Sequence, residues 1–204
     1  MSGVSSVIAH KSKWLTVTTQ FMQLIRFSHT IFALPFALLA TAWAYGVPLP
    51  ASDSIAMEQS SYLVFRWKSL LGILLCMVTA RSFAMALNRL LDHRWDGENP
   101  RTMSRHLPAK ILTRSSVGWF SVCCAIAFVV SCGLFLPNIV PLILSLPVLI
   151  FLAGYSLAKR FTNLVHFWLG AALMLAPICV WIALRGEIVL WNPWDILQIG
   201  RAHV

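Results

Sequence analysis

Charged residues are scarce in this 204-residue sequence. Asp and Glu together number seven, Lys and Arg number sixteen, and charged residues make up 11% of the chain. In an average soluble domain about a quarter of the residues are charged, so this composition argues against an ordinary soluble enzyme. The hydrophobic share of 58% and the mean hydropathy of +0.75 instead indicate a protein whose helices cross a membrane.

Cysteine motifs and internal repeats are also missing. No zinc or redox spacing relates the five cysteines, which all lie in apolar runs: Cys76, Cys123, Cys124, Cys132 and Cys179. We expect these thiols to pack between helices as small hydrophobic groups. Although the net charge is +9, no basic patch interleaved with aromatic residues is present, which argues against nucleic-acid binding.

Five apolar segments predict membrane helices, so the expected fold class is all-α, a polytopic transmembrane helical bundle in contact with the lipid bilayer. The five helices are expected at about residues 24–46 with an interruption at Pro35, from near Leu70 to the Asp96 region, at 117–136, at 139–158 with a kink at Pro147, and at 162–184. The start of a sixth helix is expected near Trp194. The first apolar run is long and lacks a clear cleavage site, so we interpret it as a retained helix, not a signal peptide.

Basic residues gather in two connecting segments. The first lies between the second and third helices and contains Arg89, Arg94, Arg101, Arg105, Lys110 and Arg114. The second follows the fourth helix and contains Lys159 and Arg160, whereas the loop around Pro137 has no charge. The positive-inside rule therefore places both basic segments, and the N-terminal segment 1–19, on the cytoplasmic side of the cytoplasmic (inner) membrane.

A polar stripe marks the end of the second helix. Asn88, Asp92 and Asp96 are spaced at i, i+4 and i+8, and Arg81 falls near the same helical face because steps of 7 and 11 residues almost complete whole turns. Carboxylates at a membrane helix are costly and indicate a functional site. Mg²⁺ commonly binds one or two carboxylates together with substrate phosphates, so the stripe predicts a Mg²⁺–diphosphate site in which the nearby arginines and lysines neutralise phosphate charge.

A plainer interpretation of the stripe is open at this point. Asp92 and Asp96 can pair with neighbouring arginines on a solvated helix end, which requires no ligand. Arg81 fits a structural counter-ion as well as a substrate contact.

Four segments together resemble one known family. Asn88-x-x-x-Asp92-x-x-x-Asp96, with the following Asn99-Pro-Arg-Thr and Arg105-His-Leu-Pro, resembles the first Asp-rich motif of the UbiA family of intramembrane aromatic prenyltransferases. The resemblance covers about residues 20–192 and is strongest to the 4-hydroxybenzoate polyprenyltransferase branch and its menaquinone-pathway relatives. The other matching segments are residues 25–37, Tyr155-Ser-Leu-Ala-Lys159-Arg160, and residues 169–177.

This resemblance implies an activity and a set of site residues. It implies that Mg²⁺ binds a polyprenyl diphosphate, whose prenyl group is transferred to an aromatic acid, 4-hydroxybenzoate, in ubiquinone or menaquinone biosynthesis. By motif match, the catalytic and metal-binding residues are Asn88, Asp92 and Asp96. By the same match, Tyr155, Lys159 and Arg160 are expected to contact the diphosphate or to stabilise the cation. Arg81 and Arg105 are further expected diphosphate contacts. Contacts to the aromatic substrate are expected from Arg26 and His29, for which a lipid-facing Arg and a packed His are the alternatives.

The sequence departs from the family pattern in two places. In the loop Arg105-His-Leu-Pro-Ala-Lys110, family members commonly have glycine at the last position. The family's second Asp-rich motif lies beyond a sixth helix, whereas this sequence stops shortly after the predicted start of that helix. We therefore expect residues 20–198 to be part of a longer parent of about nine helices, inactive alone. Residues 199–204 are expected to be a non-native tail, because Ile199-Gly-Arg-Ala-His-Val204 can be translated from a common sequencing adapter.

Two alternatives to this function are open. The acceptor can be a different one, such as haem, homogentisate, chlorophyllide or a naphthoate. A non-enzymatic transporter or ion-binding membrane protein is the second alternative, and it predicts inverted repeats and helices broken at mid-membrane.

Overall fold

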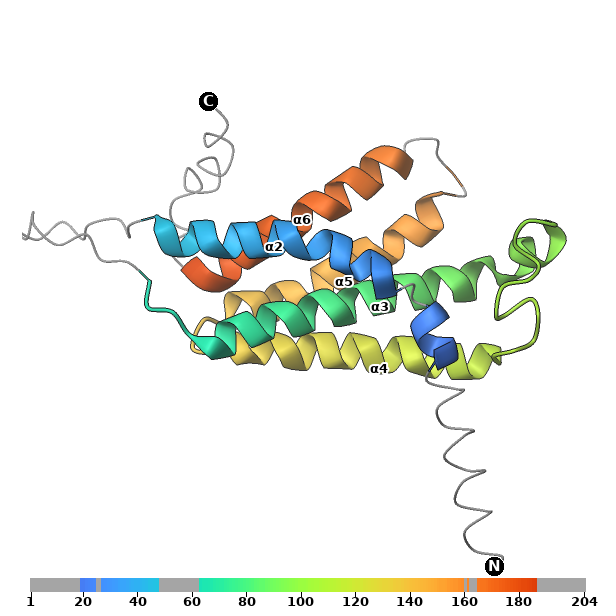
Figure 1. Cartoon of the computed structure of the whole chain (residues 1–204), viewed down its shortest axis with the longest axis horizontal. Helices are drawn as coiled ribbons and strands as arrows, with labels where there is room; N and C mark the ends of the chain where they lie inside the picture. The colour runs from blue at the N-terminus through green and yellow to red at the C-terminus, as the bar shows by residue number, and fades with distance from the viewer. Residues whose placement is uncertain (1–18, 25–26, 48–62, 160, 162–164, 187–204) are drawn as a thin grey trace, which may run out of the picture.

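A computed structural model describes residues 19–24, 27–47, 63–159, 161 and 165–186 (Figure 1). Within these ranges every regular element is helical, which confirms the predicted all-α class. The elements are α2 (Phe27–Gly46), α3 (Trp67–Glu98), α4 (Arg114–Cys132), the short 3₁₀ helix η1 (Gly133–Phe135), α5 (Val140–Ala158) and α6 (Val165–Arg185).

Four of these helices are long and apolar enough to cross a membrane: α3, α4 continued by η1, α5 and α6. The fifth, α2, has 20 residues, of which Leu34–Gly46 form an apolar stretch. Large apolar side chains such as Trp119, Ile150 and Phe167 point away from the bundle and are 69%, 71% and 76% exposed. Such a surface suits lipid and would be costly in water, so the predicted polytopic membrane bundle is confirmed.

The predicted interruption of the first helix at Pro35 is wrong, because α2 continues through this residue. A proline inside a helix removes one N–H donor and crowds the preceding turn, at a cost of roughly 3 kcal/mol. Packing of α2 against α6 through the buried residues Ala37 and Ala40 favours a continuous helix. The helix also continues through Pro147 in α5. The predicted sixth helix near Trp194 lies outside the described residues.

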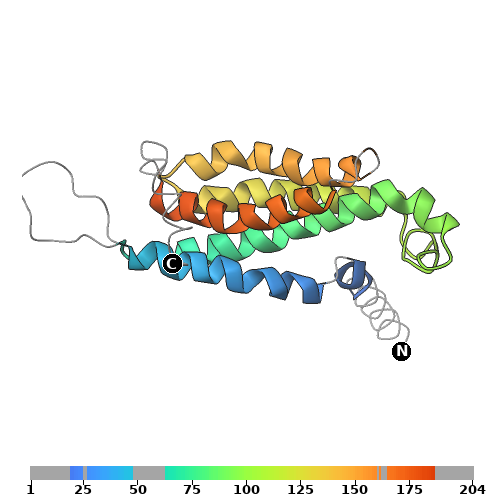
Figure 2. The ribbon, with the colours of Figure 1, turned by 90° about the horizontal axis from the view of Figure 1, so that it is seen from above.

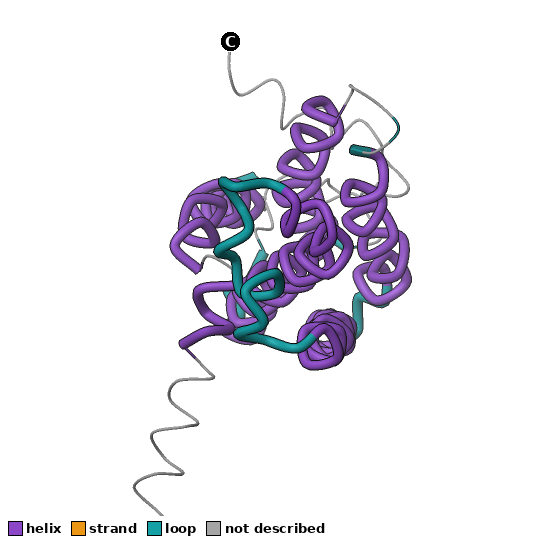
Figure 3. Tube along the Cα trace, turned by 90° about the vertical axis from the view of Figure 1, so that its right-hand side faces the viewer, coloured by secondary structure: helices purple, strands orange, loops and turns teal. Residues whose placement is uncertain are grey.

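Helix α3 is central to the bundle and contacts α2, α4, α5 and α6. Its residue Ile73 packs with Ala37 and Ala40 of α2 and with Val180 and Ala183 of α6. The small side chains of Ala37, Ala40 and Ala183 let these membrane helices approach closely. Close approach supplies the dispersion contacts that hold helices together in lipid. Figure 3 shows these helices nearly end on, gathered in one bundle.

Polar side chains at one end of the bundle, the buried Arg185 and the half-buried Asn138, donate hydrogen bonds to helix termini. The Arg185 guanidinium donates through Nη1 to the carbonyl oxygens of Ala44 at 3.2 Å and Val47 at 2.9 Å, where α2 ends. Asn138 donates through Nδ2 to the carbonyls of Ile182 and Ala183 near the end of α6, each at 3.0 Å. Because the last carbonyls of a helix have no partner within it, these contacts stabilise both ends.

The opposite end carries the polar elements. Residues 99–113 connect α3 to α4 in a compact loop at this end, where α5 also finishes (Figures 1 and 2). Thr113 caps α4 by accepting a hydrogen bond from the Ser116 N–H. The basic loop and Lys159 therefore share one end of the bundle, as the loop charges predict; the side of the membrane that this end faces stays a prediction.

Candidate functional site

The predicted stripe divides into two clusters at the end of α3. A four-residue step advances about 40° around a helix, so Asp96 lies about 80° from Asn88. The same geometry places Arg89, seven residues before Asp96, within about 20° of it. Asn88 and Asp92 accordingly contact Lys159 directly after α5, whereas Asp96 contacts Arg89 of α3 and Arg105 of the following loop.

The first cluster is formed by Asn88, Asp92 and Lys159. Lys159 follows the last residue of α5, and its ammonium donates to Asn88 Oδ1 at 2.5 Å and pairs with Asp92 Oδ2. The lysine and aspartate side chains are 24% and 16% exposed, so solvent screens this contact only in part. Two of the three predicted metal ligands thus converge on a single positive charge.

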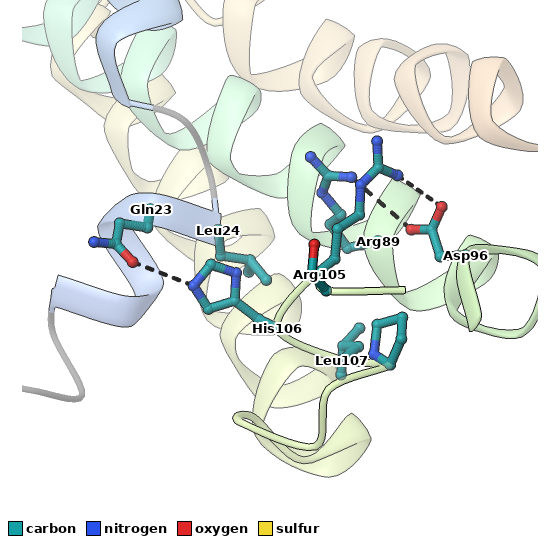
Figure 4. Close-up of a pocket in the computed structure, with 9 residues that line it drawn as sticks. Gln23, Leu24, Arg89, Asp96, Arg105, His106 and Leu107 are labelled. Atoms are coloured by element: carbon teal, nitrogen blue, oxygen red, sulfur yellow. Dashed lines mark hydrogen bonds and ion pairs between the residues drawn. The ribbon is translucent and has the colours of Figure 1, made fainter. Parts of the chain in front are cut away.

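The second cluster is built around Asp96. Its carboxylate accepts a hydrogen bond from Arg105 Nη1 at 2.7 Å and lies 3.9 Å from Arg89 Nη1, as Figure 4 shows. Thr102 Oγ1 donates to the Asp96 backbone carbonyl at 2.9 Å. These contacts fasten the loop to the end of α3. The ion-pair interpretation is therefore realised for Asp96, with one arginine from its own helix and one from the loop.

A polar cavity of about 270 Å³ adjoins this second cluster (Figure 4). Its lining includes Gln23 and Leu24 from the short helical segment 19–24, and Ser104 and His106 from the loop. His106 Nε2 lies 3.4 Å from Gln23 Oε1. Burial, assisted by the positive charge of Arg89, lowers the pKa of His106 below its ordinary value. The neutral imidazole is therefore favoured beside the two guanidinium groups.

A second, mainly apolar cavity of about 330 Å³ extends between α3, α4, α5 and α6. Three residues of the predicted site line it, namely Arg81, Asn88 and Tyr155. The Nε atom of Arg81 is buried and has no hydrogen-bond partner among the described residues. Because Asn88 belongs both to this lining and to the Lys159 cluster, the apolar cavity ends beside the two convergent oxygen ligands.

The structure brings most of the predicted site residues to one end of the bundle. Arg26 and Arg160 lie outside the described residues, as does the side chain of His29. Sequence reasoning proposed neighbouring arginines as partners of Asp96 but did not single out Arg89, although their seven-residue spacing offered that signal. It also missed His106, which only the folded loop brings next to α3.

The donor set limits how a metal can be held. Within the described part of the chain, no cluster of three or more His, Cys, Asp or Glu side chains is arranged to hold a metal ion. Oxygen ligands from one amide and one carboxylate are what Mg²⁺ uses when substrate phosphates and water complete its shell. The Lys159 ammonium between them acts as a stand-in for such a cation, so the donors fit Mg²⁺ that arrives with a phosphate-bearing substrate.

Comparison with known proteins yields one family. The sequence profile of the UbiA prenyltransferase family matches residues 33–200. Proteins named 4-hydroxybenzoate octaprenyltransferase from Photobacterium profundum and Vibrio campbellii are each 29% identical, over 180 and 183 residues. These alignments cover 87% and 88% of this chain but 57% and 58% of the relatives, so the chain spans a little over half their length.

A solved structure supports the same fold. The apo structure of a UbiA homolog from Aeropyrum pernix K1 superimposes with a TM-score of 0.67 at 25% sequence identity. The match covers 82% of this chain and 56% of that chain. The helical arrangement that carries the two clusters is thus similar to the arrangement in that protein.

Proposed function

This chain belongs to the UbiA prenyltransferase family, and we propose that the protein transfers a polyprenyl group from a polyprenyl diphosphate to an aromatic acid such as 4-hydroxybenzoate. One observation carries the proposal: Asn88 and Asp92 direct two oxygen ligands at one cation position, and this position adjoins a large apolar cavity. A polyprenyl diphosphate needs both environments side by side: a cation position for its charged diphosphate and an apolar cavity for its tail.

Asn88 and Asp92 would hold Mg²⁺. Asp96, the third expected ligand, lies one turn further along α3, where it pairs with Arg89 and Arg105. When bound, Mg²⁺ supplies positive charge that stabilises the departing diphosphate. Lys159 adds positive charge beside Asn88 and Asp92, and Arg81 adds positive charge from the lining of the apolar cavity. The buried Arg81 Nε, which lacks a partner among the described residues, is suited to donate to an anionic oxygen of the substrate.

The apolar cavity would hold the isoprenoid tail. Its walls include Ile73, Phe128, Leu152 and Leu173, whose apolar side chains suit an isoprenoid chain. Exclusion of water from this region prevents hydrolysis of the cation before the aromatic ring carbon attacks it. In this reaction the C–O bond between the prenyl group and the diphosphate breaks, the ring carbon beside the phenol oxygen forms a new C–C bond to the allylic cation, and the ring proton passes to an oxygen of the departing diphosphate.

The proposal also includes a location and a pathway. The bundle would span the inner membrane with its loop end on the cytoplasmic side. The basic residues of the α3–α4 loop and its flanks favour this orientation. In this orientation a soluble aromatic acid reaches the site from the cytoplasm and the product stays in the bilayer. Such a product is suited to ubiquinone or menaquinone biosynthesis.

A membrane assay of the complete gene product tests the function. Membranes are incubated with labelled 4-hydroxybenzoate and polyprenyl diphosphates, and the proposal predicts a labelled product that extracts into organic solvent. Parallel reactions with a naphthoate, homogentisate and haem identify a different acceptor. If no acceptor yields product while labelled compound accumulates inside sealed vesicles, the transporter alternative replaces the enzyme.

A further inference from the structure

We propose that Lys159 and the divalent cation compete for the same two oxygen atoms, so that the metal enters the site only when the Lys159 ammonium leaves it. This inference rests on the proposed function, because it takes Asn88 and Asp92 as metal ligands. It adds a role for Lys159, which is to hold the ligand pair in place and to be exchanged for the metal.

The contacts of the ammonium are those of a ligated cation. Lys159 Nζ donates to Asn88 Oδ1 at 2.5 Å and pairs with Asp92 Oδ2. The two acceptors lie one helical turn apart on α3, so one cation bridges them without a change in the helix. The lysine comes from the end of α5 and therefore also joins α5 to α3 at this end of the bundle.

The two cations cannot both occupy this position. Mg²⁺ binds oxygen at about 2.0–2.1 Å, which places it within about 4 Å of an ammonium on the same oxygens. At that separation, charges of +2 and +1 repel strongly in a partly buried site. The lysine has a flexible four-carbon stem and a side chain that is 24% exposed, so it can swing aside.

This exchange couples metal binding to diphosphate binding. The displaced ammonium loses its carboxylate partner, and a phosphate oxygen gives it a new one. Metal without diphosphate must therefore bind weakly, whereas metal and diphosphate must strengthen each other's binding by the same factor. A lysine that only ties α5 to α3 predicts no such coupling.

Mn²⁺ binding to the purified chain in detergent, measured by electron paramagnetic resonance, tests this exchange. Lys159→Met is expected to bind Mn²⁺ roughly tenfold more tightly than wild type without diphosphate, because the competing charge is gone. Lys110→Met is the matched control, since it removes an exposed lysine of the same loop end, and its affinity is expected to stay within about twofold of wild type. Equal or weaker Mn²⁺ binding by Lys159→Met, or no binding by either protein, overturns the proposal.

Inorganic pyrophosphate provides the second arm. Pyrophosphate should tighten Mn²⁺ binding by wild type more than by Lys159→Met. Only wild type has a displaced ammonium, for which a phosphate oxygen becomes the new partner. An equal effect on both proteins contradicts the exchange. Lys159→Gln, which keeps a donor for Asn88 without the charge, should repeat the tighter Mn²⁺ binding and so guards against a folding defect of the methionine variant.

The Mn²⁺-binding experiment and the membrane assay of prenyl transfer can fail independently of each other. Membranes that form no prenylated product while Lys159→Met still tightens Mn²⁺ binding would contradict the enzyme and leave the exchange intact. Product formation with unchanged Mn²⁺ affinity in Lys159→Met would do the reverse.

Discussion

At the scale of single residues, Asp92 and Asp96 differ although they lie one turn apart. Asp92 meets the Lys159 ammonium, which a flexible stem can withdraw, whereas Asp96 is fixed between Arg105 and Arg89. Asp96 is also the more buried of the two, with a side chain 11% exposed. These contacts suit Asp92 to cation exchange and Asp96 to holding the loop against α3.

Lys110 adopts an unfavourable backbone conformation in that loop. Its φ of 55° lies in the left-handed region, and its N–H donates to the Leu107 carbonyl at 3.1 Å. A side chain in this region is strained, whereas glycine is not. Lys110→Gly should therefore raise the free energy of unfolding by about 0.5–1 kcal/mol, as measured by thermal unfolding in detergent.

Lys110→Ala is the control for that substitution. It removes the same exposed side chain and charge but keeps the β-carbon that causes the strain. Its stability should stay within about 0.5 kcal/mol of wild type, and stabilisation equal to that of the glycine variant would mean that charge, not strain, is responsible.

His106 should make stability depend on pH. Burial and the Arg89 charge lower its pKa in the folded protein, so the unfolded chain binds the extra proton more readily between the folded value and about 6.5. Stability from this group is complete above about pH 6.5 and is lost as the pH falls below it. The melting temperature of wild type minus that of His106→Gln should therefore decrease from pH 8 to pH 5, and a constant difference would refute this role of His106.

At the scale of elements, α3 combines a membrane segment with a site. Its 32 residues rise about 48 Å, which exceeds a hydrocarbon core of about 30 Å. The surplus carries Asn88, Asp92 and Asp96 toward the polar end of the bundle. This length reconciles an apolar helix with carboxylates that would be costly in lipid.

Gly72 fixes how closely α3 approaches the end of α4. A β-carbon added there would lie 2.9 Å from Cζ of the buried Phe135 in η1. Gly72→Val should lower the free energy of unfolding by about 1–3 kcal/mol because the buried ring must shift to make room for the added side chain. Gly170→Val in α6, where nothing lies within 4 Å, should have a much smaller effect in the same thermal assay. Equal losses in both variants would show that valine disturbs the helices themselves.

The positions of the helices could be predicted from the sequence, whereas their polar contacts could not. Apolar run length placed α4, α5 and α6 to within a few residues, since lipid leaves few alternatives to a helix. The expected interruption at Pro35 failed because local propensity was outweighed by packing. The division of the stripe into two clusters follows from the rotation of the helix. The partners of its carboxylates, Lys159 and Arg105, depend on how α5 and the loop fold back onto α3, and residue spacing does not define this.

At the scale of the whole molecule, two cavities of different character meet the end of α3. The apolar cavity runs between the membrane helices and reaches Asn88, whereas the polar cavity lies under the loop and reaches Asp96. A substrate with a long apolar tail and an anionic head fits this division, because each part finds a lining of its own polarity.

Ala176 on α6 offers a way to test the tail cavity. Ala176→Leu adds bulk to its lining, so the ratio of kcat/KM for long to short prenyl diphosphates should fall by about tenfold or more. Ala171→Leu, on the same helix but exposed and outside the lining, should leave that ratio unchanged. An unchanged ratio for both variants would place the tail elsewhere.

The whole scheme depends on Asn88 and Asp92 holding the metal that carries the diphosphate. The decisive measurement is the rate of prenyl transfer in membranes of wild type, Asp92→Ala and Glu98→Ala, each with Mg²⁺ and with a chelator. Glu98 is an exposed carboxylate at the same helix end and serves as the control. We expect Mg²⁺-dependent product from wild type and Glu98→Ala and loss of turnover in Asp92→Ala. Turnover by Asp92→Ala at the wild-type rate, or equal product with the chelator, would contradict this assignment.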